Sequence, residues 1–255
     1  MRPWSKSKLD VATSCPLRFH LQYVEKAQGS RVTRGEGRIG RAAHRALETL
    51  LKGKDVKIND LLAQYALDEK LTSVETEELL CLRDQILSFI DRFQLWMDRH
   101  NVKRPDLYIE RRLALRENFS KTKFWDNKNG MIRGVVDLMV RVPAQGGVNV
   151  VILDHKTGRS KDMTYHDDQM RIYAVMADSN IARVRSVRLA MHFLRHEEIK
   201  WFPPISIDVI RSEYRPWLLD KIVSVETELA ARTTTDANPG WGCDYCAYQH
   251  QCPAK

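Results

Sequence analysis

The sequence predicts an α/β fold in which helices flank a mixed central sheet. Three observations predict it. Apolar residues recur at helical spacing through the first hundred residues, short runs rich in β-branched residues follow Pro105, and a helical stretch separates two of these runs. At 43% hydrophobic and 29% charged, the 255 residues have a globular composition, not a disordered or collagen-like one. We expect a single domain over residues 1–255, because no repeat or long flexible linker divides the sequence.

The first part of the chain is expected to be helical. The predicted helices span residues 5–23, 37–51, 59–70 and 74–99. The first of them is interrupted at Cys15, because Pro16 can begin a second helix as its first residue. Cys81 lies within the apolar pattern of the last helix, so we expect it to be a core residue.

Strands dominate after Pro105. The predicted strands span residues 107–115, 131–142, 149–156, 184–193 and 197–202. A polar hairpin loop is expected over residues 118–130, and further helices over 164–178 and 206–231. The tail over 233–255 has little periodicity and contains three of the five cysteines.

Charge and hydropathy limit the possible partners. The chain has 41 basic and 33 acidic residues, a net charge of +8 that is compatible with a polyanionic partner but does not establish one. No stretch approaches the ~18 apolar residues of a membrane span, and the amino terminus lacks the apolar segment of a secretory signal. We therefore expect a cytoplasmic protein, in which cysteines bind metal or are buried and do not form disulfides.

Two acidic residues and a lysine form the most informative pattern. Asp154 and Lys156 are two apart on a predicted strand, so their side chains share one face and His155 points away. If this strand pairs with the one before it, Asp137 lies beside Asp154. Two buried carboxylates repel each other, and a hard divalent cation such as Mg²⁺ or Mn²⁺ would resolve that conflict. The alternative is a simple Asp–Lys salt bridge at the edge of the sheet.

Five short motifs follow one another along the chain. They are Ser5-Lys-Ser-Lys-Leu9 with Cys15-Pro16 and Phe19, Gly37-Arg-Ile-Gly40-Arg-Ala-Ala-His44, Gly134-Val-Val-Asp137, Asp154-His-Lys156 and Gln169-Met-Arg-Ile-Tyr173. In this order they resemble the PD-(D/E)XK nuclease superfamily, and within it the RecB-like and CRISPR-associated exonuclease group. The resemblance covers nearly the whole chain and implies a restriction-endonuclease-like fold. A helical insertion over residues 55–103 departs from the pattern and is either a structural elaboration or a substrate guide.

The resemblance implies hydrolysis of phosphodiester bonds. Asp137 and Asp154 would hold one or two Mg²⁺ or Mn²⁺ ions, with His44 and the backbone carbonyl of His155 as further ligands. Such an ion lowers the pKa of bound water and offsets charge on the phosphate oxygens. Lys156 would position the attacking water and stabilise the developing negative charge.

Three more residues are expected at this site. Glu110, on the preceding strand, is the candidate for a third acidic group, with Glu117 as the other choice. Gln169 and Tyr173 are four residues apart and share one helical face. By the resemblance they would orient Lys156 or the scissile phosphate, whereas without it they would be ordinary helix packing.

The cysteines predict a second site. Cys243, Cys246 and Cys252 have the spacing C-x₂-C-x₅-C, and Cys15 supplies a distant fourth thiolate. Four thiolates suit either a tetrahedral Zn²⁺ or a [4Fe–4S] cluster, and His250 in place of one sulfur would favour zinc. A remote first cysteine matches the iron–sulfur site of the RecB-like group, so the resemblance favours the cluster. Such a site would join the two ends of the chain.

The substrate is predicted mainly by resemblance. Five arginines just before and within the His44 helix are either phosphate contacts or a solvated helix face: Arg31, Arg34, Arg38, Arg41 and Arg45. Four tryptophans can either stack on bases or pack in the protein: Trp4, Trp201, Trp217 and Trp241. The group implies single-stranded DNA degraded from an end by an exonuclease. The alternatives are a catalytically silent DNA-binding or scaffold protein with a structural Fe–S or Zn site, and a zinc-dependent nucleic-acid-binding protein.

Overall fold

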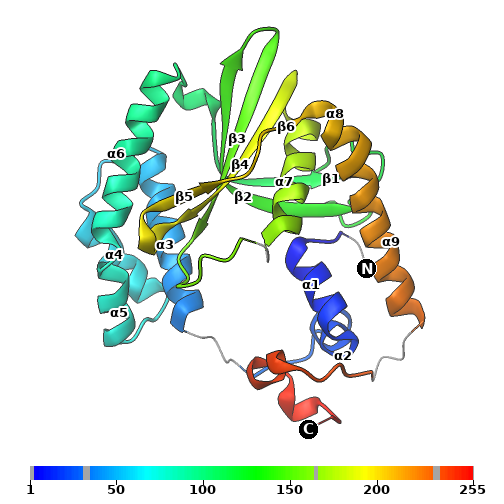
Figure 1. The fold of residues 1–255 in the computed structure, drawn as a ribbon. Helices are drawn as coiled ribbons and strands as arrows, with labels where there is room; N and C mark the ends of the chain where they lie inside the picture. Colours follow the sequence, from blue (N-terminus) through cyan, green and yellow to red (C-terminus); the bar gives the residue numbers. More distant parts are fainter. Residues whose placement is uncertain (1–2, 31–34, 164–165, 232–235, 255) are drawn as a thin grey trace. The chain divides into compact units, whose positions relative to one another are not determined.

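The structure is a computed structural model that describes residues 3–30, 35–163, 166–231 and 236–254. The chain comprises two compact units. The sheet unit comprises Thr33–Arg112 and Val135–Ile210. The terminal unit comprises Met1–Val32, Leu113–Gly134 and Arg211–Lys255. Figure 1 shows the fold along the sequence.

The helices at the amino terminus confirm the predicted break. They are α1 (Lys6–Ser14), α2 (Pro16–Phe19) and a π-helical turn over His20–Val24. Ser5 begins α1, because its hydroxyl accepts a hydrogen bond from the backbone N–H of Lys8 at 3.2 Å. Cys15 begins α2 in extended backbone conformation, and its sulfur accepts from the N–H of Arg18 at 3.5 Å. The candidate metal-binding cysteine is therefore also the N-cap of a helix.

Four helices precede the sheet. They are α3 (Gly35–Leu51), α4 (Ile58–Asp68), α5 (Ser73–Leu80) and α6 (Arg83–Arg99). The prediction of one helix over 74–99 was wrong, because the chain turns at Cys81–Leu82 between α5 and α6. Cys81 is exposed at this turn and is not the expected core residue. A capping box of Thr72 and Glu75 starts α5 as a short helix of its own.

The strands agree closely with their predicted positions. They are β1 (Leu107–Leu115), β2 (Ile132–Ala144), β3 (Gly147–Lys156), β4 (Val184–Phe193), β5 (Glu198–Trp201) and β6 (Ile205–Ser206). Their order is β1-β2-β3-β4-β5, and β6 pairs with β4. The pair β2–β3 is antiparallel and the pair β3–β4 is parallel, so the sheet is mixed as predicted. Helix α7 (Asp167–Asn180) makes the crossover that a parallel pair requires, and residues 164–165 of the predicted helix lie outside the described residues.

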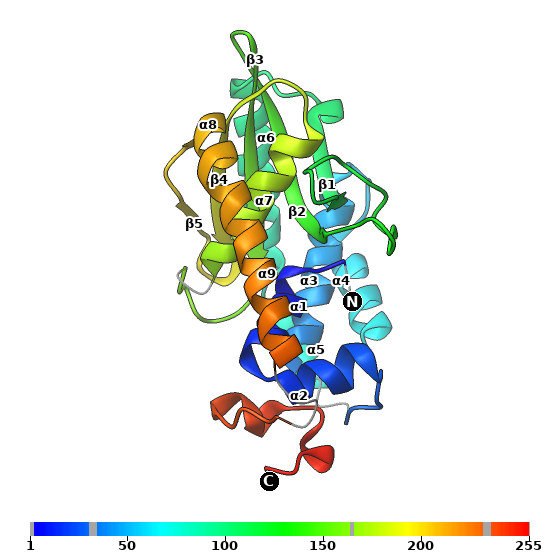
Figure 2. The same cartoon turned by 90° about the vertical axis from the view of Figure 1, so that its right-hand side faces the viewer.

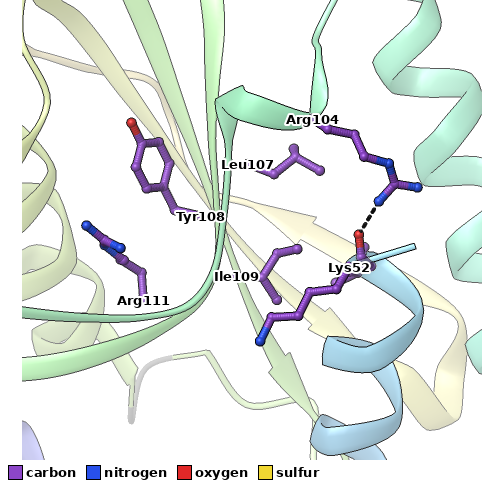
Figure 3. Close-up of a pocket in the computed structure, with 7 residues that line it drawn as sticks. Lys52, Arg104, Leu107, Tyr108, Ile109 and Arg111 are labelled. Carbon is purple, nitrogen blue, oxygen red and sulfur yellow. Dashed lines mark hydrogen bonds between the residues drawn. The ribbon is translucent and has the colours of Figure 1, made fainter. Parts of the chain in front are cut away.

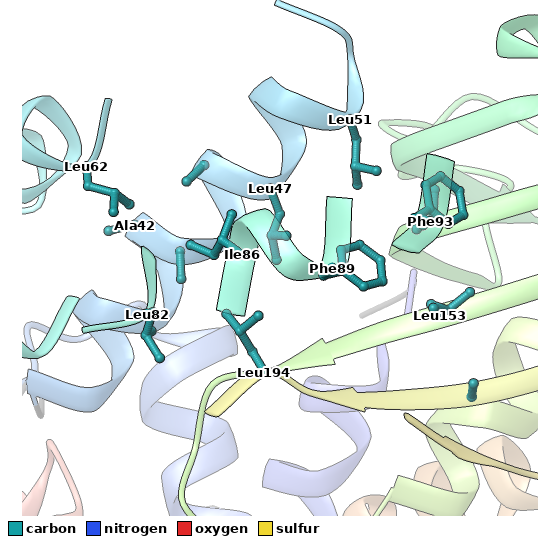
Figure 4. Close-up of a cluster of buried hydrophobic side chains, with 14 of the residues drawn as sticks. Ala42, Leu47, Leu51, Leu62, Leu82, Ile86, Phe89, Phe93, Leu153 and Leu194 are labelled. Carbon is teal, nitrogen blue, oxygen red and sulfur yellow. The ribbon is translucent and has the colours of Figure 1, made fainter. Parts of the chain in front are cut away.

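Helices cover both faces of the sheet in the sheet unit. Helices α3 to α6 lie on one face and α7 on the other (Figures 1 and 2). Leu47, Ile86 and Phe89 pack with Leu153 on the first face, and Figure 4 shows this cluster in close-up. Because side chains alternate along β3, Leu153 and His155 face this core while Asp154 and Lys156 face α7. One strand thus supplies both the core and the candidate site.

The predicted helix over 206–231 is observed in three pieces. They are α8 (Ile207–Val209), a π-helical turn over Ile210–Tyr214 and α9 (Arg215–Ala231). No helix in the described part of the chain combines the length and the hydrophobicity that crossing a bilayer requires.

Candidate active site

Three ligand-type side chains from separate elements converge in the sheet unit. His44 of α3, Glu110 of β1 and Asp137 of β2 place one ligand atom each within 4.8 Å of one another. His44 Nδ1 lies 3.6 Å from Asp137 Oδ2 and 3.7 Å from Glu110 Oε1. Glu110 has a φ of 47°, a left-handed conformation that costs energy for a residue other than glycine and that recurs at functional sites. Glu117, the other candidate for this position, is exposed after the end of β1.

The backbone of His155 holds two members of this group in place. Its N–H donates to Asp137 Oδ2 at 2.7 Å, and its carbonyl oxygen accepts from His44 Nε2 at 3.0 Å. With Nε2 acting as the donor, the Nδ1 of His44 faces the two carboxylates. Leu138 pairs with Leu153 in the antiparallel register, so Asp137 and Asp154 occupy the next positions on neighbouring strands. The expected proximity of the two strands is confirmed.

A second group of side chains surrounds Asp154. The Nζ of Lys156 lies 2.6 Å from Asp154 Oδ2, as expected for two residues on one face of a strand. Gln169 donates to Asp154 Oδ1 at 3.0 Å and to the Tyr173 hydroxyl at 2.8 Å, and it accepts from Lys156 at 3.3 Å. Tyr173 in turn donates to the carbonyl oxygen of Val135 at 2.8 Å. The helix face of Gln169 and Tyr173 therefore orients Asp154 and Lys156.

The electrostatics show that negative charge is crowded here. Burial and the neighbouring Asp154 carboxylate raise the pKa of Asp137 from 3.8 to about 7. Burial by itself lowers the pKa of His44. The interaction with Glu110 and the negative charges of Asp137 and Asp154 outweigh burial, so the pKa rises from 6.5 to about 9. Burial and the charges of Asp154 and Asp137 raise the pKa of Tyr173 well above 10, so its hydroxyl stays a donor.

The residues present fit a hard divalent cation. Asp154 is 2% exposed, and none of the residues that the structure describes gives its Oδ2 a hydrogen bond of good direction, although the Lys156 ammonium is close. Carboxylate oxygens are the ligands that Mg²⁺ and Mn²⁺ prefer. A 2+ charge would also remove the repulsion that raises the pKa of Asp137.

His192 of β4 is a residue that sequence reasoning missed. Its Nδ1 lies 2.9 Å from the Nδ1 of His155, and both rings are buried. Phe89 stacks on the His192 ring with centroids 4.3 Å apart and meets the His155 ring edge-on. Burial is the largest cause that lowers the pKa of both histidines, that of His192 to about 4, so both rings are neutral. Only the parallel register, which pairs His155 with His192, could have revealed this contact.

The arginines of α3 mostly have protein partners. Arg38 pairs with Glu75, Arg41 with Glu69 and Arg45 with Asp68, at 2.5, 2.8 and 2.7 Å. These acids come from the segment over Ile58–Leu80, so each of the three arginines has a carboxylate partner on a neighbouring helix or turn. Arg31 and Arg34 lie outside the described residues.

The tryptophans also have structural surroundings. Trp4 is completely buried and donates to Glu226 Oε1 at 2.8 Å, so it is a packing residue and not a base-stacking one. Trp201 is 38% exposed under the Arg188 guanidinium, and Trp217 is partly buried. The side chain of Trp241 lies outside the described part of the structure.

The cysteines belong to the terminal unit. Cys15, Cys246 and Cys252 pack against one small cluster of Leu17, Leu21 and Tyr248. Cys243 lies in the adjoining 3₁₀ turn and accepts from the Gly240 N–H at 3.3 Å. All of these thiols are free. Among the described residues, no three sulfurs come within 4.8 Å of one another.

Hydrogen bonds dock the tail onto the amino-terminal segment. The carbonyl oxygen of Ala247 accepts from the N–H and the hydroxyl of Ser30, at 2.7 and 2.9 Å. Asn238 donates to the carbonyl of Ser14, one residue before Cys15, at 2.9 Å. His250 Nε2 lies 2.8 Å from Gln251 Nε2, so this nitrogen already has a partner.

A family model described as the PD-(D/E)XK nuclease superfamily matches residues 3–253. The chain belongs to the PD-(D/E)XK nuclease superfamily. The mixed sheet of six strands with flanking helices agrees with the restriction-endonuclease-like fold of this superfamily. Nuclease activity, a divalent metal and a nucleic-acid substrate follow from membership at the level of the superfamily.

Other comparisons add little. No curated protein matches the chain. Among solved structures, the crystal structure of SSO0001 is 16% identical, with a TM-score of 0.35, over 85% of this chain and 96% of that one. A likeness this distant carries no argument about the site.

Proposed function

We propose that this protein is a Mg²⁺- or Mn²⁺-dependent deoxyribonuclease whose active site lies in the sheet unit. The observation that supports it most is the meeting of two groups of side chains around His155. One contains the ligand atoms of His44, Glu110 and Asp137, and the other contains Asp154 and Lys156. A structural salt bridge would need only the second group. Metal-assisted hydrolysis needs both.

Each residue has a separate role in this proposal. Asp137 and Asp154 hold the cation, with His44, Glu110 and the His155 carbonyl as further ligands. A bound Mg²⁺ or Mn²⁺ supplies Lewis acidity to the phosphate and lowers the pKa of water at the site. Lys156 places its ammonium beside the Asp154 carboxylate, where it orients the attacking water and stabilises charge on the phosphate oxygens.

The helix residues act through hydrogen bonds. Gln169 holds both Asp154 and the Lys156 ammonium, so it restricts the direction in which Lys156 can donate. Tyr173 anchors Gln169 to the backbone at Val135. We propose that these two residues position the catalytic lysine.

We propose that single-stranded DNA is the substrate and that it is degraded from an end, in a cytoplasmic protein. The net charge of +8 agrees with a polyanionic substrate, and the motif order is similar to that of RecB-like exonucleases. We also propose one nuclease domain over residues 1–255, with an insertion over 55–103 and a cysteine-rich tail over 233–255.

We propose a [4Fe–4S] cluster on Cys15, Cys243, Cys246 and Cys252, with structural Zn²⁺ as the alternative. Three of these cysteines share one apolar cluster, and the hydrogen bonds of the tail bring both chain ends to it. A single tetrahedral zinc holds its sulfurs about 3.8 Å apart, whereas the cluster spreads them over four irons. A brown preparation that absorbs near ~400 nm supports the cluster, and a colourless one with stoichiometric zinc contradicts it.

The activity test uses end-labelled linear DNA, single- and double-stranded, with circular single-stranded DNA as the comparison. Each is incubated with Mn²⁺, Mg²⁺ or EDTA. We expect linear single strands to shorten with either metal, circles to persist, and EDTA to stop the reaction. Cleavage of circles contradicts the exonuclease assignment. Inertness with every metal, while DNA binding is retained, favours the scaffold protein.

A further inference from the structure

The cations of the basic pocket beside Glu110 do not converge on one ligand. The pocket has a volume of about 340 Å³, and Lys52, Arg104 and Arg111 are among the residues that line it. Figure 3 shows Arg111 on the opposite side of β1 from Arg104 and Lys52. The Arg104 guanidinium is turned to the carbonyl oxygen of Leu51, to which it donates at 2.8 Å. One phosphate therefore does not reach both arginines.

The terminal unit instead exposes an aromatic ring. The loop over residues 116–131 joins β1 to β2 (Figure 2). Trp125 lies in this loop and is 65% exposed. It is the most exposed of the tryptophans whose side chains the structure describes, and Trp201 follows at 38%. The sequence predicts a polar hairpin here, so this ring escaped the selection of candidate base-stacking residues.

Two neighbours fix the orientation of the Trp125 indole. The Phe124 ring meets it edge-on, with ring centroids 4.9 Å apart and an interplanar angle of 89°. The guanidinium of Arg133, on β2, lies 5.0 Å from the centre of the Trp125 ring and 5.3 Å from that of Phe124. These contacts hold the indole, yet most of its surface remains accessible. A further flat group can therefore stack on it.

The backbone that carries Trp125 is held from within the loop. The Asp126 carboxylate accepts from the Thr122 hydroxyl at 2.6 Å and from the Asn129 N–H at 2.9 Å, and these bonds lower its pKa from 3.8 to about 2. The Gly130 N–H donates to the Asp126 carbonyl oxygen at 3.0 Å, and a Cβ on Gly130 would lie 2.5 Å from that oxygen. Because the loop is already ordered, binding at Trp125 costs little conformational entropy.

The charge around the ring suits a polyanion. The chain has five basic and two acidic side chains over residues 116–133. Lys121, Lys123 and Lys128 are exposed, and none of the carboxylates that the structure describes forms an ion pair with them. A single-stranded nucleic acid offers phosphates to the ammonium groups and an unpaired base to the indole. An anionic membrane would need a broader apolar face than one ring supplies.

We propose that Trp125 and the lysines of its loop bind the single-stranded substrate. An unpaired base stacks on the indole, and neighbouring phosphates pair with Lys123 and Lys128, the two lysines nearest to Trp125 in the sequence. The inference rests on the proposed nuclease function and deepens it, because it assigns single-strand recognition to residues of the terminal unit. Duplex DNA keeps its bases stacked on one another, so it cannot make the aromatic contact.

The test measures binding of the full chain to a fluorescent single-stranded oligothymidylate in EDTA, with a gel to verify that the DNA stays intact. We expect Trp125→Ala to weaken binding about fivefold or more, and Trp125→Phe to retain most of the affinity because a stacking face remains. Leu95→Ala is the matched control. It shortens an apolar side chain of α6 that is also 65% exposed, and it should change the affinity by less than twofold.

Salt dependence distinguishes the lysines from the ring. Replacing Lys123 and Lys128 together by glutamine should lower the magnitude of the slope of log K against log salt by about 1.4, the loss of two phosphate contacts on a single strand. Trp125→Ala should leave this slope unchanged, because the indole displaces no counterions. Replacing Lys54 and Lys57 by glutamine removes the same charge from exposed lysines before α4 and should also leave the slope unchanged.

Separate outcomes overturn this proposal and the nuclease proposal. The loop proposal fails if Trp125→Ala binds like Leu95→Ala, or if Trp125→Phe binds as weakly as Trp125→Ala. An equal loss of duplex binding contradicts the stacking of an unpaired base. A loss confined to vesicles that contain phosphatidylserine assigns the loop to a membrane surface and also overturns the proposal. In each of these cases, metal-dependent cleavage by the unchanged chain leaves the nuclease proposal standing. If the unchanged chain cleaves no DNA with any metal, the nuclease proposal fails, and the assignment of the loop to a substrate strand fails with it.

Discussion

The candidate active site and the cysteine region are built in opposite ways. At the candidate active site, backbone pairing between strands places Asp137, Asp154 and Lys156, and hydrogen bonds from His155 and Gln169 hold the two aspartates. Around the cysteines, the backbone forms short 3₁₀ turns, and the side chains pack on a cluster of only three buried residues. The first region is held by strand pairing and by hydrogen bonds. In the second, the ligand proposed for the cysteines would supply much of the order.

Because of this difference, we expect substitutions in the first region to affect catalysis and substitutions in the second to affect stability. Removing a ligand from a site that the sheet already holds should abolish reaction and leave the fold unchanged. Removing a cysteine should do the reverse. Four measurements distinguish the two regions, from the largest expected effect to the smallest.

Asp154→Asn and Lys156→Ala should each lower metal-dependent DNA cleavage about 1,000-fold or more, to background, and so should Asp137→Ala. The sheet positions are unchanged, so the melting temperature should stay within a few degrees. Cleavage rates on labelled DNA and thermal unfolding measure the two effects. Glu198→Gln, which removes a partly exposed acid paired with Lys161, serves as the control and should cleave normally. Normal turnover by a folded variant removes that residue from the mechanism.

His192→Asn should change how stability depends on pH. The folded pKa of His192, about 4, lies below its ordinary 6.5, so its neutral form stabilises the fold above pH 6.5 and this stability is lost as the pH falls toward 4. The loss amounts to at most about 3 kcal/mol. Urea unfolding at pH 7.5 and pH 5 should show a smaller difference for the variant.

The raised pKa values of Asp137 and His44 act in the opposite sense, because their protonated forms are favoured in the fold. Both groups are present in both proteins, so their effect largely cancels when the variant is compared with the unchanged chain. Equal pH dependence in the two proteins would show that His192 is not kept neutral by the fold.

Cys246→Ser should lower the melting temperature by about 5 °C or more, equivalent to about 2 kcal/mol for a chain of this size, and should expose the tail to proteases. Cleavage of DNA by the remaining folded protein should persist. Cys81→Ser is the matched control, since Cys81 is exposed at the turn between α5 and α6. If both variants melt like the unchanged chain, the four cysteines share no stabilising ligand.

The affinity for Mn²⁺ should rise with pH by about tenfold per unit for each proton released, most steeply below pH 7. Asp137, with a pKa of about 7, and His44, with a pKa of about 9, must both lose a proton to bind the ion. The affinity should level off above pH 9. Calorimetric titration in matched buffers measures it, and an affinity that does not vary between pH 6 and 8 would contradict this protonation scheme.

The sequence by itself determined the features that depend on the periodicity of side chains within one helix or strand. Alternation along a strand placed Asp154 and Lys156 on one face, and helical spacing placed Gln169 and Tyr173 together, because both follow from backbone geometry within a few residues. The prediction of a single helix over 74–99 failed because the apolar pattern continues through the turn at Cys81–Leu82.

Only the tertiary structure decided which distant groups meet. Three features join segments that periodicity cannot connect. They are the ion pairs of Arg38, Arg41 and Arg45, the contact of His155 with His192, and the basic pocket beside Glu110, which Lys52, Arg104 and Arg111 line. Strand register and helix packing set these contacts, and they depend on the burial of the whole core. A motif can therefore name the reacting groups, while their pKa values and partners arise only when the chain folds.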